Sequence, residues 1–217
     1  MPVPSEEILV YGAGGFAREV AWLAGECGNR ILAYIDDSPS THGQRLNDVE
    51  VIGLPDAVAK FPNAAVAIGV GNPATRQMLA DKVDSVGLRH AVLIHPHVAR
   101  SRWIDVGEGT VICAGSTLTT NISIGRHVQV NLHCTIGHDV VMEDFATLAP
   151  GVHISGWVHL AKGAYVGTGA VVINGTASKP LVIGEGAVVG AAACVVKSVE
   201  PRTTVVGVPA KALPVRQ

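Results

Sequence analysis

The stretch ISIGRHVQVNLHCTIGHDVVM, residues 122–142, carries an aliphatic residue at every sixth position. A second column, two residues before each of these positions, is nearly always small or aliphatic. A six-residue period is neither that of a helix nor that of a simple hairpin, and it is typical of hexapeptide-repeat β-helices. We therefore predict a parallel β-helix in which three short flat faces close one triangular coil. The aliphatic positions of the main column are Val106, Ile112, Leu118, Ile124, Val130, Ile136, Met142, Leu148, Ile154, Leu160, Val166 and Val172.

Three faces of six residues make a coil of about eighteen, so residues eighteen apart should be stacked at the strand spacing of about 4.8 Å. This relation measures distances along the β-helix. After Val172 the register slips by five residues, and it resumes at Ile183, Val189 and Val195. The stretch NGTASKP, residues 174–180, falls in this slip. We predict that it forms a loop pushed out of the stack.

Before about residue 95 the sequence has a different pattern. A short apolar run leads directly into a glycine-rich turn, and apolar residues then recur at helical spacing. The predicted strands are residues 8–11, 31–35, 64–68 and 91–94, and a further helix is predicted at 73–86. Strands that alternate with helices predict a parallel sheet covered by helices. The predicted fold class is α/β plus all-β, with a small Rossmann-like domain at residues 1–95 and a β-helix domain at residues 96–217.

Composition and charge exclude several classes of partner. The formal net charge of −2 leaves no basic stripe for a phosphate backbone, so nucleic acid is not expected. The N-terminus lacks the pattern of a signal peptide, and no apolar run reaches the ~20 residues that span a bilayer. The four cysteines stand far apart without CxxC spacing, which fits a reducing compartment. We expect a cytoplasmic protein with no membrane partner.

Two sets of motifs resemble a known family. The hexads VIGEGAVVGAAACVV (residues 182–196) and the ending GVPAK (residues 207–211) resemble the left-handed β-helix acyltransferases. YGAGGFAREV (residues 11–20) and YIDD (residues 34–37) resemble the N-terminal domain of the bacterial sugar acetyltransferase family that includes PglD and NeuD. The resemblance covers essentially the whole chain.

The family resemblance implies a function. The implied reaction is transfer of an acetyl group from acetyl-CoA to the amine of a nucleotide-linked amino sugar. The resemblance also implies a homotrimer and a role in the biosynthesis of lipopolysaccharide or another surface glycan. It implies no metal. An alternative within the same fold is O-acetylation of the sialic acid type. An alternative of another class is a noncatalytic nucleotide-binding module.

The glycine turn at Gly12, Gly14 and Gly15 lies where a strand gives way to a helix, and such a turn points backbone N–H groups at an anion such as phosphate. Asp36 lies 22 residues after Gly14, the position at which NAD enzymes bind a ribose hydroxyl. The resemblance instead implies a nucleotide-activated sugar, with the turn at its phosphates and Asp36 and Asp37 near the nucleoside. A third possibility is that the turn only allows close packing of helix and sheet.

His138 is the candidate general base, and the resemblance implies this role through the stretch IGHDVVM. An imidazole with a pKa of about 6.5 suits a base that works near neutrality. The carboxylate of Asp139 could fix its tautomer and stabilise its cation. Neighbours on a flat strand point to opposite faces, however, so this second role is the less secure expectation.

Gly156 should stack directly on His138, because the two are eighteen residues apart. A bare glycine leaves room for a thioester and offers an unshielded N–H to a tetrahedral oxyanion. The resemblance places Thr168, Gly190 and Ala191 along the pantetheine arm of acetyl-CoA and Lys211 near a CoA phosphate. The alternative for these positions is simple packing of the coils.

A metal site is a further alternative, because some left-handed β-helix proteins are γ-class carbonic anhydrases with three histidine ligands. His97, His133 and His138 fit their spacing, since 138 − 133 = 5 and 133 − 97 = 36. Two coils separate His97 from His133 by roughly 9.6 Å, whereas a zinc–nitrogen bond is about 2 Å long. Such a site would therefore have to be completed by a neighbouring subunit.

Overall fold

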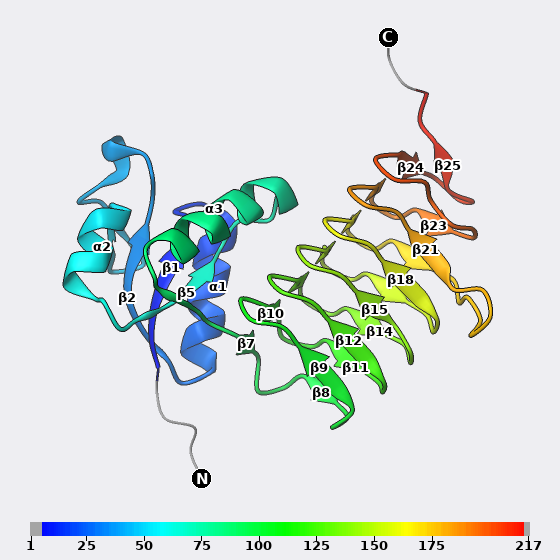
Figure 1. Ribbon diagram of the computed structural model, residues 1–217, viewed down its shortest axis with the longest axis horizontal. Helices are drawn as coiled ribbons and strands as arrows, with labels where there is room; N and C mark the ends of the chain where they lie inside the picture. The colour runs from blue at the N-terminus through cyan, green and yellow to red at the C-terminus, as the bar shows by residue number, and fades with distance from the viewer. Residues whose placement is uncertain (1–5, 215–217) are drawn as a thin grey trace. The chain divides into compact units, whose positions relative to one another are not determined.

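Strand β1 (Glu7–Tyr11) is the central strand of the N-terminal sheet, and its residues Ile8, Leu9 and Val10 are completely buried. The structure, a computed structural model, describes residues 6–214 of the chain. It divides into two units, Met1–Pro96 and His97–Gln217, each described here by itself (Figure 1). None of the helices within residues 6–214 is long and apolar enough to cross a membrane.

The first unit is a mostly parallel sheet with the strand order β3-β4-β2-β1-β5-β6. The chain passes from β1 to β2 on one side and later places β5 on the other side of β1, so the strand order reverses there. The crevice outside the carboxyl ends of β1 and β5 is thus the usual ligand position in such a sheet. The other elements of this unit are α1 (Gly15–Glu26), β2 (Arg30–Ile35), η1 (Pro39–Thr41), β3 (Arg45–Leu46), β4 (Val49–Ile52), α2 (Leu54–Lys60), β5 (Ala65–Ile68), α3 (Pro73–Ser85), β6 (Arg89–His90) and β7 (Leu93–Ile94).

Two details of this unit differ from the sequence-based expectation. The hairpin of β3 and β4 was not predicted, although Asn47 and Asp48 both adopt the positive φ that a tight two-residue hairpin turn requires. The strand predicted at 91–94 is found only at residues 93–94, as β7, and β5 pairs instead with β6 at residues 89–90. Apolar periodicity misses such short polar strands, since backbone pairing and not side-chain burial defines them.

The second unit is the predicted parallel β-helix, built from three sheets of very short strands. Strands β12, β15, β18 and β21 can be followed in Figure 1 as one such stack. The first sheet contains β10 (Val111–Ile112), β13 (Gln129–Val130), β16 (Thr147–Leu148), β19 (Tyr165–Val166), β22 (Val188–Val189), β24 (Thr204–Val206) and β25 (Lys211–Ala212). The second contains β8 (Ala99–Arg100), β11 (Thr117–Leu118), β14 (Thr135–Ile136), β17 (His153–Ile154), β20 (Val171–Val172) and β23 (Cys194–Val195). The third contains β9 (Ile104–Val106), β12 (Ile122–Ile124), β15 (Val141–Met142), β18 (Val158–Leu160) and β21 (Leu181–Ile183).

The register of the coils follows the eighteen-residue relation. Thr117 pairs with Thr135, and Thr135 pairs with His153. Beyond the slip the pairing changes to Val158 with Leu181, so the five extra residues leave the stack within the loop at 174–180. The aliphatic column remains in phase on both sides of that loop and is buried from Ile112 onward, as Ile112, Val130, Leu148, Val166 and Val189 show, whereas Val106 at its start is only partly buried. Each such side chain contributes about 1.5–3 kcal/mol to stability.

The faces meet at corners where one residue adopts a left-handed backbone conformation. We call residues 101–103, 119–121, 137–139 and 155–157 the His138 corner, which joins the second sheet to the third. Its left-handed positions are Asn121, Asp139 and Trp157, with φ of 54°, 57° and 58°. We call residues 113–116, 131–134, 149–152, 167–170 and 190–193 the Thr168 corner, which joins the first sheet to the second.

Candidate active site

His138 and Asp139 form a hydrogen-bonded pair at the His138 corner. The His138 Nδ1 lies 2.8 Å from the Asp139 Oδ2, and the imidazole is 55% exposed while the carboxylate is 26% exposed. If Nδ1 carries the proton and donates it to the carboxylate, Nε2 is left with its lone pair facing outward. The pair therefore has the arrangement of a general base and its orienting acid.

The left-handed backbone of Asp139 explains how adjacent side chains can meet. The expectation that neighbours point to opposite faces holds for a flat strand, but Asp139 has a φ of 57° and ends the strand-like stretch. Its N–H donates to the Thr120 carbonyl oxygen at 3.2 Å, which fixes the turn. The other carboxylate oxygen accepts a long hydrogen bond of 3.4 Å from the Asn121 amide.

Gly156 lies directly against the His138 ring, as the eighteen-residue relation requires. A Cβ atom at Gly156 would approach the Cε1 and Nε2 atoms of His138 to 2.5 Å. The absence of a side chain at this position is therefore what lets the imidazole occupy its place. The role of the Gly156 N–H toward an oxyanion remains a prediction.

Two residues of this corner were not singled out from the sequence. The Trp157 indole stands edge-on to the His138 imidazole with 6.2 Å between ring centroids, and Asn121 contacts Asp139. Each lies eighteen residues from Asp139, which is one coil of the β-helix. Applying the eighteen-residue relation to Asp139, as well as to His138, would have identified them.

The predicted acetyl-CoA residues are divided between two corners. Thr168, Gly190 and Ala191 belong to the Thr168 corner, where the Thr168 carbonyl accepts a hydrogen bond of 2.8 Å from the Ala192 N–H. Along one face, five extended residues separate this corner from the His138 corner, which is a distance of about 16 Å. Lys211 lies in β25, paired antiparallel with β24. One chain therefore places these residues at two separate corners of the β-helix.

His133 occupies a different corner from His138. It belongs to the Thr168 corner, where a Cβ atom added to Gly115 would meet its ring at 2.4 Å. Within residues 6–214 no three His, Cys, Asp or Glu side chains of one chain are grouped to hold a metal ion. A carbonic anhydrase site would thus need ligands from another subunit, as its spacing already indicated.

The three glycines of the N-terminal turn have different surroundings. A Cβ atom at Gly12, which has a φ of 114°, would come within 3.2 Å of the Gly69 carbonyl oxygen, so this glycine is required for close packing. Gly14 and Gly15 are exposed at the start of α1. The first N–H groups of a helix have no intrahelical acceptor, so these two positions suit a phosphate.

A second loop at this sheet edge was missed from the sequence. Residues 69–72 follow β5, and the Asn72 side chain caps α3 by accepting from the Thr75 N–H at 3.0 Å. The buried Arg76 donates from Nη1 to the carbonyl oxygens of Val70 (3.1 Å) and Gly71 (3.0 Å). Burial lowers the pKa of Arg76 to about 9. The loop is thus held firmly beside the glycine turn.

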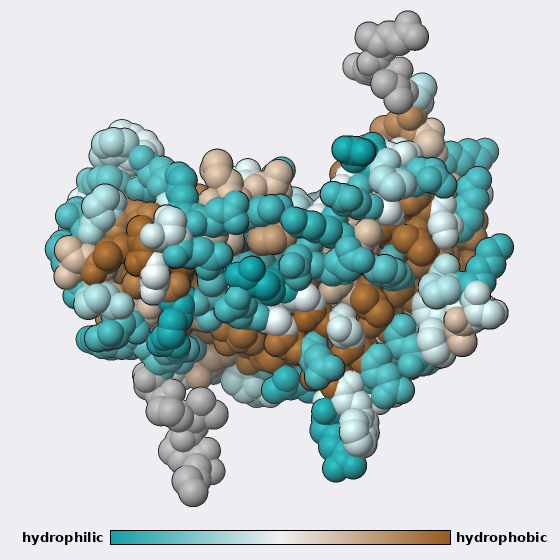
Figure 2. Space-filling view, in the orientation of Figure 1, coloured by the Kyte–Doolittle hydropathy of each residue, from teal (hydrophilic) through white to brown (hydrophobic). Residues whose placement is uncertain are grey.

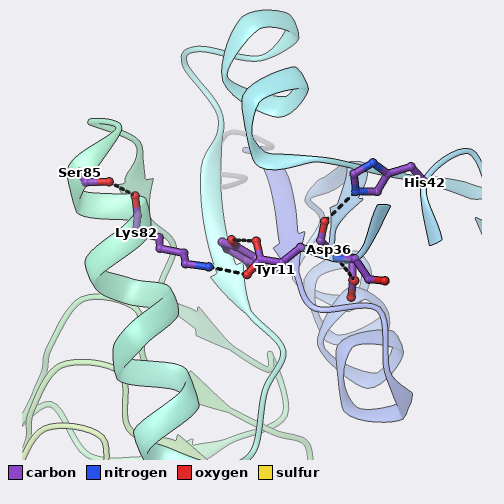
Figure 3. A network of polar contacts seen from close by, with 7 residues as sticks. Tyr11, Asp36, His42, Lys82 and Ser85 are labelled. Atoms are coloured by element: carbon purple, nitrogen blue, oxygen red, sulfur yellow. Dashed lines mark hydrogen bonds and ion pairs between the residues drawn. The ribbon is translucent and has the colours of Figure 1, made fainter. Parts of the chain in front are cut away.

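Asp36 and Asp37 hold their own loop through hydrogen bonds (Figure 3). The Asp36 carboxylate accepts from the Ser38 N–H at 2.9 Å and from the Thr41 hydroxyl at 3.2 Å. The Asp37 carboxylate accepts from the Tyr11 hydroxyl and from the Lys82 ammonium, both at 2.6 Å. Neither carboxylate is free, so a nucleoside would have to share or displace these partners.

The environment of Asp37 makes stability depend on pH. Burial alone would raise the pKa of the Asp37 carboxyl, but the hydrogen bonds from Lys82 and Tyr11 outweigh it and the pKa is lowered. Burial, together with the bond to Asp37, raises the pKa of the Tyr11 phenol. A carboxyl whose pKa is lower in the folded than in the unfolded protein stabilises the fold above the unfolded-state pKa, which is about 3.9 for Asp. That stabilisation is lost as pH falls through the folded-state pKa.

We expect Asp37→Asn to reduce the free energy of unfolding by about 1 kcal/mol at pH 7, because a half-exposed pair is screened by solvent. The reduction should be smaller at pH 3, below the unfolded-state pKa of about 3.9, because the contribution is lost as pH falls toward the lowered folded-state pKa. Urea unfolding at both pH values measures it. Asp81→Asn, at an exposed carboxylate one residue from Lys82, is the control with little effect at either pH. An equal loss at both pH values would contradict the expectation.

Comparison with known proteins identifies the family. Residues 7–83 match the PglD N-terminal domain family. Over 215 residues, which are 94% of this chain and 95% of the relative, the sequence is 33% identical to GDP-perosamine N-acetyltransferase from Escherichia coli O157:H7. The chain belongs to the PglD/NeuD-like family of sugar acetyltransferases.

Solved structures of the family agree with this assignment. WeeI from Acinetobacter baumannii AYE is 37% identical and superposes with a TM-score of 0.90, over 96% of this chain and all of WeeI (100%). PerB from Caulobacter crescentus, in complex with CoA and GDP-perosamine, is 26% identical with a TM-score of 0.87, over 96% of this chain and 97% of PerB. These matches confirm the predicted Rossmann-like domain followed by a left-handed β-helix, and they confirm the acetyltransferase class.

Proposed function

We propose that this protein transfers the acetyl group of acetyl-CoA to the amino group of a nucleotide-linked amino sugar. The observation that carries the proposal is the His138–Asp139 pair, hydrogen-bonded at 2.8 Å directly beneath Gly156, in a chain that belongs to a family of sugar acetyltransferases. An exposed imidazole with an oriented tautomer is the group that an attacking amine needs as its proton acceptor.

In the proposed reaction these residues have the following roles. The neutral amine of the sugar attacks the thioester carbonyl carbon, and His138 Nε2 takes the proton that the nitrogen loses. Negative charge gathers on the carbonyl oxygen, where the Gly156 N–H is the candidate donor. The carbon–sulfur bond then breaks, and the departing CoA thiolate takes the proton from the imidazolium. Asp139 holds the ring in one tautomer and stabilises its positive charge until that moment.

A homotrimer is part of the proposal, because one chain divides the acetyl-CoA residues between two corners. A neighbouring subunit could present its Thr168 corner to this chain's His138 corner. Exposed aliphatic side chains on the intervening face support such an arrangement, namely Val171, Ile173 and Val196. Figure 2 shows hydrophobic side chains on the β-helix as well, on the side where β15, β18 and β21 lie, which is the third sheet and not this intervening face.

The N-terminal unit is proposed to hold the nucleotide, at the crevice between the ends of β1 and β5. Gly14 and Gly15 offer N–H groups to a phosphate, and Asp36 and Asp37 lie at the end of the neighbouring strand β2. A nucleotide-linked sugar is favoured over NAD here, because one relative is named GDP-perosamine N-acetyltransferase and PerB is solved in complex with GDP-perosamine. The product would serve glycan biosynthesis in the cytoplasm.

The proposal predicts thiol release when the protein is mixed with acetyl-CoA and a matching nucleotide amino sugar. GDP-perosamine is the first probe, followed by UDP- and dTDP-linked amino sugars, and mass spectrometry should find one added acetyl group on nitrogen. The matched control is the same nucleotide sugar with a hydroxyl in place of the amine. Faster turnover of that control would indicate O-acetylation, and no turnover with any acceptor, despite nucleotide binding, would indicate a noncatalytic module. A chelator should leave the rate of acetyl transfer unchanged. Loss of activity in the presence of the chelator would instead favour the metal site.

A further inference from the structure

A buried arginine beside the nucleotide crevice takes no part in the proposed reaction. Arg76 lies in the first turn of α3 and is completely buried. Its Nη1 group donates to the carbonyl oxygens of Val70 and Gly71, at 3.1 Å and 3.0 Å. Because burying a guanidinium costs free energy, these two bonds must do more than fill space in the core.

The two bonds decide where the loop at residues 69–72 points its N–H groups. In a planar trans peptide the C=O and N–H bonds point in opposite directions. The Val70 carbonyl shares its peptide plane with the Gly71 N–H, and the Gly71 carbonyl shares its plane with the Asn72 N–H. Since both carbonyls face the buried Arg76, both N–H groups face outward. In the part of the chain that the structure describes, neither N–H has a hydrogen-bond acceptor.

The loop lies against the glycine turn, so these N–H groups share its crevice. The Gly69 N–H donates to the Tyr11 carbonyl at 2.8 Å, which extends the pairing of β5 with β1. A Cβ atom at Gly69 would come within 2.5 Å of the Ala17 Cα, so the loop packs directly on the first turn of α1. Neither Gly71 nor Gly14 has a neighbour within 4 Å of its Cβ position. The outward side of the loop is therefore open at the same sheet edge as the turn.

We propose that Arg76 is a positioning residue for nucleotide binding, which holds the loop so that the Gly71 and Asn72 N–H groups donate to the diphosphate of the nucleotide-linked sugar. This inference rests on the proposed function and adds a second set of donors to those of the glycine turn. Successive backbone N–H groups that face outward together form an anion site, and their bonds to a charged phosphate are stronger than neutral ones. Arg76 acts through the loop and needs no contact with the phosphate.

Steady-state kinetics with the most active nucleotide amino sugar of the panel test the role of Arg76. Arg76→Met removes the donors and should raise the KM for that acceptor about tenfold, with the kcat and the KM for acetyl-CoA nearly unchanged. Arg76→Lys restores a buried donor and should recover part of the affinity. A purely structural role would instead lower kcat through loss of folded protein, at an unchanged acceptor KM. Arg89→Lys, at an arginine of β6 that is 64% exposed, is the matched control and should change neither constant.

A second pair of variants does not depend on the folding of Arg76→Met. Gly71 has no positive φ and no neighbour that a side chain would meet, so other residues fit there. Gly71→Asp places a carboxylate beside the proposed diphosphate and should raise the acceptor KM about tenfold, less so at high salt, because like charges repel and salt screens them. Gly71→Asn has nearly the same shape without the charge and should raise the KM far less.

Two results would overturn the inference, namely an unchanged acceptor KM in folded Arg76→Met and equal KM values for Gly71→Asp and Gly71→Asn. Failure of the proposed function is distinct, since the unaltered protein would then turn over no nucleotide amino sugar. Calorimetry with GDP, UDP and dTDP would still decide, because Gly71→Asp should bind the preferred nucleoside diphosphate about tenfold more weakly than Gly71→Asn does. Equal affinities of these two variants, or no binding to the unaltered protein, would refute the role of the loop.

Discussion

His138→Asn lowers the kcat of acetyl transfer by roughly 10³-fold, within the range that a positioned general base contributes. The His138 ring is more than half exposed, and its contacts are with Asp139, Gly156 and Trp157. The substitution should therefore leave folding intact, which the thermal unfolding midpoint checks. Binding of acetyl-CoA, measured by calorimetry, should be nearly unchanged, because the loss concerns proton transfer. The rate itself is followed by thiol release.

His133→Asn is the matched control for this experiment. His133 is also exposed and also occupies a left-handed corner position, with a φ of 57°, a conformation that asparagine tolerates well. If His138 alone is the base, His133→Asn keeps nearly full activity. If both histidines were metal ligands, both variants would lose activity together with bound metal. Full activity in His138→Asn would refute the proposed mechanism.

Gly156→Ala lowers kcat by roughly 10²-fold, because a methyl group at this position cannot coexist with the imidazole in its present place. The added Cβ atom would lie 2.5 Å from two ring atoms, so the side chain of His138 must move. A displacement of about 1 Å at a catalytic group can cost this much rate. The free energy of unfolding should change by no more than about 1 kcal/mol, since a side chain and not the backbone gives way.

Gly25→Ala provides the matched control for Gly156→Ala. Gly25 lies near the end of α1, and a Cβ atom there would meet nothing within 4 Å. Alanine favours a helix over glycine, so this variant should be fully active and slightly more stable. Unchanged kcat in Gly156→Ala would show that His138 and Gly156 do not share one reaction site.

The features that could be read from the sequence are those set by periodic burial. A coil can bury its interior only if an aliphatic side chain recurs every six residues, so Val130, Leu148 and Val166 mark the β-helix and its register. The same register places Gly156 on His138. The strand, glycine turn and helix at the start of the N-terminal unit could be predicted for the same reason, because Leu9 and Val20 occupy positions that must be buried.

The remaining features depend on backbone conformation and on long-range side-chain partners, which periodicity does not report. Asp139 reaches His138 only because its φ is positive, and aspartate carries no clear signal for that conformation. The separation of Thr168 from His138, by contrast, could have been counted from the hexads, because 168 − 138 = 30 is one coil of eighteen residues plus two faces of six. The bonds that occupy Asp36 and Asp37 come from residues far away in sequence, such as Lys82.

The loop at residues 174–180 leaves the stack at the His138 corner, and the Gly175 N–H donates to the Gly156 carbonyl at 3.0 Å. Its five additional residues do not disturb the core, because Leu160 still pairs with Ile183 and Val166 with Val189. Chain length can therefore vary next to the reacting groups while the buried columns stay in phase. A fold of this kind can acquire new substrates by insertion at a corner, without a new core having to evolve.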